Sequence, residues 1–192
     1  MEEILLIGGG GHCKSVIDVI EQEGQFKIAG IIDHPELLDT KILDYKVIGS
    51  DNDLPKLSLR YKYALVTVGQ ITSPQLRIKI YENLKKLEFV LPVIKSPRAY
   101  ISKYATVKEG SIIMHDALIN VNVCINENCI INTKALIEHD AMIAKHCHIS
   151  TGAIINGAVS VESGCFIGSH VTTKQAINIK KNSFIKAGSV VK

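Results

Sequence analysis

The stretch from Ile125 to Ile149, INENCIINTKALIEHDAMIAKHCHI, carries isoleucine at every sixth position. The same phase extends without a slip from Ile101 to Val191, and fifteen of its sixteen positions are Ile or Val, the exception being Thr173. Neither a helical period of about 3.6 nor a strand period of about two requires a branched residue at every sixth place. The period therefore predicts a solenoid built from hexapeptide units.

A second position of the repeat, four residues after each branched residue, is mostly small. It is occupied in turn by Ala105, Ser111, Ala117, Val123, Cys129, Ala135, Ala141, Cys147, Ala153, Val159, Cys165, Val171, Ile177, Ser183 and Ser189. Branched side chains would fill the interior of a triangular prism, and small residues would lie at its tight corners. Three hexapeptides would form one coil of about eighteen residues, which gives about five coils in all. The repeat predicts a β-solenoid and leaves its handedness open.

The residues before the repeat follow a different pattern, in which strands and helices alternate as in a small parallel α/β domain. The expected strands are residues 4–7, 27–32, 63–68 and 89–94, and the expected helices are residues 12–22 and 73–86. A proline in Lys95-Ser96-Pro97-Arg98 ends this alternation. We therefore expect a half-Rossmann-like α/β domain over residues 1–95 and a β-helix domain over residues 96–192.

Charge, hydropathy and cysteine usage limit the possible partners. The 22 basic and 19 acidic side chains give a net charge of +3, and no basic stripe is present to bind nucleic acid. The longest apolar runs, such as residues 4–7 and 64–68, are too short to cross a membrane, and the acidic start is unlike a secretory signal. The five cysteines form no CxxC pair, so neither a disulfide framework nor a zinc site is indicated. We expect a soluble, cytoplasmic protein.

A glycine loop, Gly8-Gly9-Gly10-Gly11, joins the first strand to the first helix. Such a loop lets backbone N–H groups approach a phosphate at the helix N-terminus. Asp33 follows the second strand, where dinucleotide sites place the acid that binds a ribose hydroxyl. His12, directly after the loop, would either contact the substrate or cap the helix. The loop therefore predicts a nucleotide-sugar site.

Two other interpretations of the glycine loop remain open. In the dinucleotide pattern G-x-G-x-x-G the third glycine would stand where this chain has Cys13. The α/β domain also offers only about half of the usual six-stranded dinucleotide fold. The loop could instead be purely structural.

The combination of Gly-Gly-Gly-Gly-His with an uninterrupted hexapeptide repeat resembles the NeuD/PglD-type sugar O- and N-acyltransferases of the hexapeptide-repeat superfamily. The sharpest similarity runs over Ile131–Asp140 and continues at His148-Ile149-Ser150 and Asn156-Gly157-Ala158. The resemblance implies a left-handed β-helix, acetyl-CoA as co-substrate, and a homotrimer with sites at the subunit interfaces. It also implies direct transfer, with no metal and no covalent enzyme intermediate.

The resemblance assigns roles to particular residues. His139 would be the general base, and Asp140 would orient its imidazole. Asn132 would contact the substrate, whereas His148 and Gly157 would lie at the acetyl-CoA. An imidazole with a pKa near 6.5 suits this task, because it accepts a proton from an attacking amine or hydroxyl at neutral pH.

The spacing of these residues tests the assignment independently. Residues eighteen apart stack on one face at about 4.8 Å, so Gly157 should lie directly above His139 and leave room for a substrate. His148 is half a coil away and should face another flank. The two histidines could therefore share one site only across a subunit interface, which favours a symmetric oligomer. The other histidines on the repeat, His115, His146 and His170, are expected to be solvated or interfacial.

The expected activity is transfer of an acetyl group to the 4-amino group of a nucleotide-linked amino sugar, as in bacillosamine-type or legionaminic-type pathways. The nearest alternative is O-acetylation of a sialic acid or a related acceptor by the same base. A third alternative is a non-catalytic trimeric scaffold that binds a nucleotide. The His139-Asp140 pair argues against the scaffold.

Overall fold

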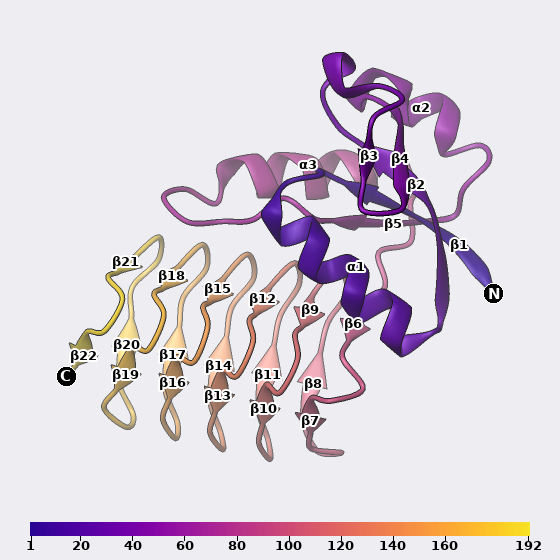
Figure 1. Ribbon diagram of the computed structural model, residues 1–192. Coiled ribbons are helices and arrows are strands. Elements are labelled where there is room, and N and C mark those ends of the chain that lie inside the picture. The colour runs from indigo at the N-terminus through magenta and orange to yellow at the C-terminus, as the bar shows by residue number, and fades with distance from the viewer. The chain divides into compact units, whose positions relative to one another are not determined.

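The computed structural model describes residues 1–192, which form two compact units. The first unit comprises Met1–Gly69 and Gln75–Pro92, and the second comprises Gln70–Pro74 and Val93–Lys192. Figure 1 labels the helices and strands of both. The short segment Gln70–Pro74 thus belongs with the C-terminal repeat, although it lies within the N-terminal half of the sequence.

The first unit contains a five-stranded sheet in the order β3-β4-β2-β1-β5. Its strands are β1 Glu2–Ile7, β2 Phe26–Ile32, β3 Lys41–Ile42, β4 Tyr45–Gly49 and β5 Tyr63–Val66. The central strands are parallel, and only β3 runs antiparallel to its neighbour β4. The three strands expected near residues 4–7, 27–32 and 63–68 are confirmed. The apolar runs at β1 and β5 are buried, as parallel strands require.

The helices of this unit are α1 Gly11–Glu23, α2 Leu54–Leu57 and α3 Gln75–Lys86, with short 3-10 turns η1 Pro35–Leu37 and η2 Asp51–Asp53. Helix α1 buries one face at helical spacing, through Val16, Ile17 and Ile20. It ends at Gly24, whose φ of 66° is left-handed and suits glycine. No helix in the structure is long and apolar enough to span a membrane.

The prediction of a strand over residues 89–94 is wrong. Val90 makes only an isolated parallel bridge to Tyr63, and Pro92 cannot donate a ladder hydrogen bond. Ile94–Lys95 does form a strand, β6, but it pairs with β9 of the solenoid. The further parallel strand of the α/β sheet is β4, which the sequence analysis missed because its residues alternate too briefly between apolar and polar.

The solenoid consists of three parallel sheets made from two-residue strands (Figure 1). One sheet, here called sheet C, contains β6 Ile94–Lys95, β9 Ile112–Ile113, β12 Ile130–Ile131, β15 His148–Ile149, β18 Phe166–Ile167 and β21 Phe184–Ile185. Sheet D contains β7 Tyr100–Ile101, β10 Leu118–Ile119, β13 Leu136–Ile137, β16 Ile154–Ile155, β19 Thr172–Thr173 and β22 Val190–Val191. Sheet E contains β8 Thr106–Val107, β11 Cys124–Ile125, β14 Met142–Ile143, β17 Ser160–Val161 and β20 Asn178–Ile179.

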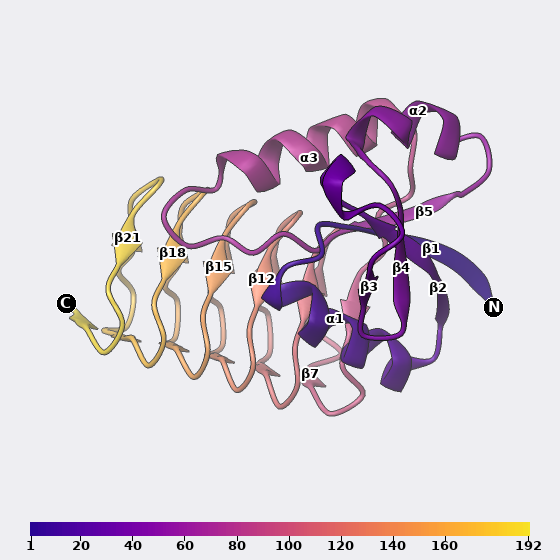
Figure 2. The same cartoon turned by 45° about the horizontal axis from the view of Figure 1, so that its top comes forward.

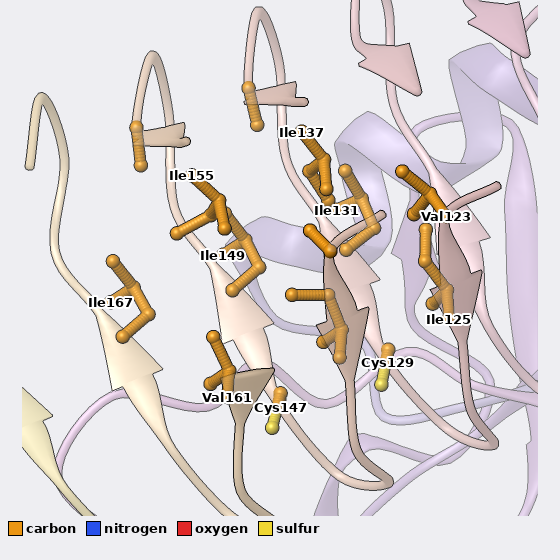
Figure 3. Close-up of a cluster of buried hydrophobic side chains, with 14 of the residues drawn as sticks. Val123, Ile125, Cys129, Ile131, Ile137, Cys147, Ile149, Ile155, Val161 and Ile167 are labelled. Atoms are coloured by element: carbon orange, nitrogen blue, oxygen red, sulfur yellow. The ribbon is translucent and has the colours of Figure 1, made fainter. Parts of the chain in front are cut away.

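The register of the solenoid confirms the predicted coil length. Leu118 pairs with Leu136, and Leu136 pairs with Ile154, so each strand stacks on the strand eighteen residues later. Figure 2 shows the successive coils lying parallel to one another. The branched residues of the period point inward, and those of the central coils are almost fully buried, as Ile131, Ile149 and Ile167 illustrate (Figure 3). Those at the two ends, Ile101, Val107, Ile185 and Val191, are partly buried.

From Gly110 onward, each corner of the prism contains one residue in the left-handed region, with φ between 53 and 76°. These residues recur every six positions as Gly110, Asp116, Asn122, Asn128, Lys134, Asp140, His146, Gly152, Ala158, Gly164, His170, Ala176, Asn182 and Gly188. The small position of the repeat follows directly after each of them. Three cysteines occupy this small position, Cys129, Cys147 and Cys165. All three are fully buried, as residues that pack the corners would be.

Candidate active site

His139 and Asp140 lie on the corner between β13 of sheet D and β14 of sheet E. Asp140 occupies the left-handed position with φ 61°, a conformation that Asp and Asn adopt more readily than most residues. Their side chains are 54% and 51% exposed, and the distance from His139 Nδ1 to Asp140 Oδ2 is 2.8 Å. A half-exposed imidazole is thus held by a carboxylate on the solenoid surface.

The hydrogen bonds around Asp140 define which atom of His139 is basic. An ionised carboxylate only accepts, so His139 Nδ1–H donates to it and Nε2 keeps its lone pair. Asn122, one coil earlier, donates from Nδ2 to Asp140 Oδ1 at 2.7 Å. This bond and that of His139 hold the pKa of the Asp140 carboxyl below its ordinary value. The sequence analysis missed Asn122. It stands eighteen residues before Asp140, so the coil length would have placed it beside this aspartate.

Gly157 lies beside His139 on the next coil, because β13 and β16 are paired in register. A Cβ atom at this glycine would stand 2.8 Å from both Cε1 and Nε2 of His139. The φ angle of Gly157 is not positive, so its backbone conformation does not require glycine. A side chain is excluded here because it would clash with the His139 ring. The structure therefore brings together three of the predicted site residues: His139, Asp140 and Gly157.

His148 and Asn132 lie elsewhere on the prism. His148 belongs to β15 of sheet C and is 7% exposed, whereas His139 is on the D/E corner. Asn132 Nδ2 is 3.1 Å from His148 Nε2, so these two predicted residues contact each other. The expectation for His146 is wrong, because this residue is 6% exposed and its Nδ1 lies 2.9 Å from Asn128 Nδ2 in the solenoid wall.

In the first unit, the glycine loop is partly occupied by internal hydrogen bonds. Gly8 N–H donates to the carbonyl of Ile32 at 2.8 Å, and Gly9 N–H donates to Asp33 Oδ2 at 2.6 Å. The other carboxylate oxygen of Asp33 accepts from the N–H of His34 at 2.8 Å. Ile42 packs so closely on Gly9 that its Cδ1 would overlap a Cβ at that position. Asp33 thus fixes the shape of the loop as well as lining the cavity beside it.

The second half of the loop is open. A Cβ atom at Gly10 or Gly11 would meet no neighbour within 4 Å, and α1 begins there without a side-chain cap or an acidic residue. Its first N–H groups therefore form a helix N-terminus that favours an anion. His12 is half-buried on the first turn of α1. Cys13 is fully buried, and burial raises the pKa of its thiol to about 11, so it remains a neutral packing residue.

A cavity of about 160 Å³ opens beside the glycine loop, at the carboxyl ends of the parallel strands. Its polar lining includes Asp33 and Asp51 but no lysine or arginine. The complete lining is Ile7, Gly8, Ile32, Asp33, His34, Pro35, Ser50, Asp51, Asn52, Val68, Leu76 and Ile80. The residues from Ser50 to Asn52 were missed in the sequence because β4, whose end they follow, was missed.

A parallel β-helix with a carboxylate-held histidine on its wall, preceded by a small α/β unit with a glycine-loop cavity, defines the class of hexapeptide-repeat sugar acyltransferases. Residues 3–84 match the PglD N-terminal domain family. This match covers the α/β unit, and the end-to-end structural likeness described next extends the resemblance to the NeuD/PglD-type sugar acyltransferases over the whole chain. The protein is an acyltransferase.

Two solved structures resemble the whole chain. The acetyltransferase domain of PglB from Neisseria gonorrhoeae is 26% identical, with a TM-score of 0.92 over 100% of this chain and 92% of that one. PerB from Caulobacter crescentus, solved with CoA and GDP-perosamine, is 29% identical, with a TM-score of 0.92 over 100% of this chain and 89% of that one. The expected left-handed β-helix is confirmed by this likeness.

A more distant structure shares the fold alone. WeeI from Acinetobacter baumannii is 19% identical, with a TM-score of 0.74 over 99% of this chain and 96% of that one. No curated protein sequence matches the chain significantly.

Proposed function

We propose that the protein transfers an acetyl group from acetyl-CoA to the 4-amino group of a nucleotide-linked amino sugar, with His139 as general base. The observation that carries the proposal is the open Nε2 of His139, which lies over Gly157 while Asp140 holds Nδ1. This arrangement supplies a neutral imidazole of defined tautomer on an accessible surface. The scaffold alternative gains no support, because the similar structures are acetyltransferases.

The nature of the donor is supported by the same relatives. The PglB acetyltransferase domain has been solved with acetyl coenzyme A, and PerB with CoA and GDP-perosamine. In this chain the backbone of Gly157 lies against the Nε2 edge of the His139 ring. We propose that its backbone N–H stabilises the oxyanion formed there, a contribution of about 3 kcal/mol in comparable sites.

His139 would perform the proton transfers. As the acceptor nitrogen bonds to the acetyl carbon, Nε2 accepts its proton, and Asp140 stabilises the resulting imidazolium. The C–S bond then breaks, and the imidazolium returns the proton to the leaving thiolate. The acetyl group passes directly to the acceptor, because no step requires an enzyme nucleophile. Hydrogen bonding between neighbouring thiols, together with burial, raises the pKa values of Cys147 and Cys165 above the ordinary range and keeps both protonated.

The acceptor nucleotide would bind in the first unit. A cavity that is lined by Asp33 and Asp51, without a lysine or arginine, suits the O–H and N–H donors of a ribose and a base. It disfavours phosphate, which is anionic. The phosphates would instead lie at the open helix N-terminus formed by Gly10 and Gly11.

A homotrimer is part of the proposal. Five of the six outward residues of sheet D, next to the His139 corner, are apolar: Tyr100, Leu118, Leu136, Ile154 and Val190. The sixth is Thr172, between Ile154 and Val190. An apolar stripe on a β-helix wall favours burial against another subunit. Light scattering should give a mass of three subunits. We place the reaction in the cytoplasm, because five unpaired cysteines suit a reducing compartment.

The test is a screen with acetyl-CoA, a panel of UDP-, GDP- and dTDP-amino sugars, and sialic acids, in which free CoA thiol is measured. An amino-sugar nucleotide should be acetylated, with a rate that also rises as its ammonium group deprotonates. Acetylation of a sialic acid hydroxyl alone would replace the proposed acceptor with the O-acetyl alternative. If no acceptor released thiol, the proposal would fail.

A further inference from the structure

Three neighbouring strands of the α/β unit present different groups at their carboxyl ends. Strand β2 lies between β1 and β4, and all three are parallel (Figure 1). The glycine loop follows β1, Asp33 follows β2, and Ser50-Asp51-Asn52 follows β4. The N–H of Asp33 donates to the carbonyl of Gly49 at 3.1 Å, so the ends of β2 and β4 lie side by side. The three strand ends therefore form a row that spans two strand spacings, or about 10 Å.

This row has the order of the parts of a nucleotide. Gly10 and Gly11 begin α1, where the helix N-terminus favours a phosphate. Asp33, one strand away, has the place of an acid that binds ribose hydroxyls. Each oxygen of its carboxylate accepts one backbone hydrogen bond and keeps a second lone pair for a ligand. A base attached to a ribose at this place would reach the end of β4.

Two side chains at the end of β4 are available to a base. Asp51 and Asn52 line the cavity beside Gly8, and both also line a second cavity of about 470 Å³. Neither side chain makes a hydrogen bond within the protein. The next carboxylate along the chain, that of Asp53, is instead occupied by the N–H and Oγ of Ser50.

The surroundings of this polar pair suit a flat ring. Leu76 and Ile80 of α3 line both cavities together with Asp51 and Asn52. The apolar side chains suit the face of a base, and the polar pair suits its hydrogen-bonding edge.

The donors and acceptors of the pair discriminate between bases. A carboxylate only accepts, whereas a side-chain amide both donates and accepts. Guanine presents two adjacent donors, N1–H and the 2-amino group, beside the acceptor O6. Asp51 can therefore accept from both donors while the Asn52 amide donates to O6. Uracil and thymine present one N–H between two carbonyl oxygens, so one of these oxygens would oppose the carboxylate.

We infer that the cavity of the α/β unit takes a guanosine diphosphate group, with Asp51 as the residue that specifies the base. The acceptor is then a GDP-linked amino sugar. Asp51 touches the base and not the reacting atoms, so it determines specificity and is not catalytic. The inference rests on the proposed function in one respect, namely that this cavity binds the nucleotide of the acceptor.

The test measures the binding of GDP, IDP, XDP and UDP to the whole chain by calorimetry. IDP lacks the 2-amino group of guanine, and XDP has a carbonyl oxygen in its place. Asp51→Asn replaces one acceptor oxygen with an N–H donor at nearly constant volume. Asp44→Asn is the matched control, because it removes the same charge from an exposed residue of the same unit that lines neither cavity.

The wild-type protein should bind GDP about 10-fold or more tightly than IDP or UDP, because IDP lacks one donor and UDP opposes an acceptor to the carboxylate. Asp51→Asn should weaken GDP binding by about 10- to 100-fold. It should also bind XDP more tightly than GDP, since its amide accepts from N1–H and donates to the 2-carbonyl. Asp44→Asn should keep the wild-type order of affinities.

Three results would overturn the inference: equal wild-type affinity for GDP and IDP, tighter binding of UDP than of GDP, or unchanged GDP affinity in Asp51→Asn. The first two need no variant, so they decide the matter even if Asp51→Asn fails to fold. Absence of binding by every nucleotide would also overturn it.

The two proposals fail in distinguishable ways. If a UDP- or dTDP-amino sugar is acetylated in preference to a GDP-amino sugar, the proposed function stands and the inference is overturned. If no amino-sugar nucleotide is acetylated although the nucleotides bind in the expected order, the proposed function fails and the guanine site at Asp51 stands.

Discussion

Replacing Gly157 with alanine tests whether the position of the His139 ring determines the rate. The new Cβ would stand 2.8 Å from Cε1 and from Nε2 of that ring. Carbon atoms in contact normally lie about 3.5–4.0 Å apart, so the ring must withdraw by about 0.7 Å or more. Because Nδ1 is bound to Asp140 at 2.8 Å, the withdrawal also strains that hydrogen bond.

A displacement approaching 1 Å at a catalytic group costs up to about 100-fold in rate. We therefore expect Gly157→Ala to lower kcat by about 10- to 100-fold, with the free energy of unfolding changed by less than about 1 kcal/mol, because the half-exposed ring can swing toward solvent. Initial rates of CoA thiol release and a thermal melt measure the two quantities.

Gly152→Ala is the matched control for this prediction. Its Cβ would stand 2.8 Å from Cε1 and 2.9 Å from Nδ1 of His170, and its φ of +65° adds backbone strain. It should therefore destabilise the protein more than Gly157→Ala while leaving kcat near the wild-type value. Wild-type kcat in Gly157→Ala, or an equal loss of kcat in Gly152→Ala, would refute the reasoning.

Three further predictions concern the two units separately. His139→Ala should lower kcat by about 10² to 10⁴ and leave the melting temperature nearly unchanged, because the side chain is half-exposed; retention of most activity would exclude His139 as base. Asp140→Asn should lower kcat less than His139→Ala does, because the base remains and only the carboxylate that accepts from Nδ1 is lost; a kcat as low as that of His139→Ala would contradict this order. Gly9→Ala should raise the KM of the acceptor about 10-fold or more without affecting that of acetyl-CoA, because its Cβ would displace Ile42 and crowd Asp33; an unchanged acceptor KM would place the acceptor elsewhere.

The solenoid could be predicted from the sequence almost completely, because its period is a local property. Each hexapeptide contains its own inward residue and its own corner, so a register counted from Ile101 also locates Gly157 against His139. The same counting would have found Asn122 beside Asp140. The α/β unit is less regular: strand β4 has only two buried residues, Val47 and Gly49, and sequence patterning gives such a strand little weight.

Contacts between distant segments could not be predicted in the same way. The sequence places Gln70 in a loop between a strand and a helix, and nothing local indicates that it binds His148, 78 positions later. The buried environment of His146 was missed for a related reason, because the corner periodicity does not reveal that Asn128 lies against its ring. Period determines which residues stack on one another, whereas the burial of the outer wall depends on what packs against it.

A second His-Asp pair in the same solenoid shows why the dipeptide alone does not define the site. His115 and Asp116 lie on the corner between β9 and β10, and Asp116 has φ 57°, close to that of Asp140. There, however, Arg98 stands eighteen residues before the aspartate and binds it at 2.7 Å.

The histidine of that second pair is also differently placed. Its Nδ1 lies 2.6 Å from Ser96 Oγ and so is not held by the adjacent carboxylate. The residue eighteen positions after it is Thr133, where His139 has Gly157. The corner backbone has a similar conformation at Asp116 and at Asp140. The two sites differ in the residues that stand on the preceding and the following coil. Asn122 below and Gly157 above His139 therefore distinguish the candidate base: the first leaves Asp140 available to the imidazole, and the second, without a Cβ atom, leaves space for the His139 ring.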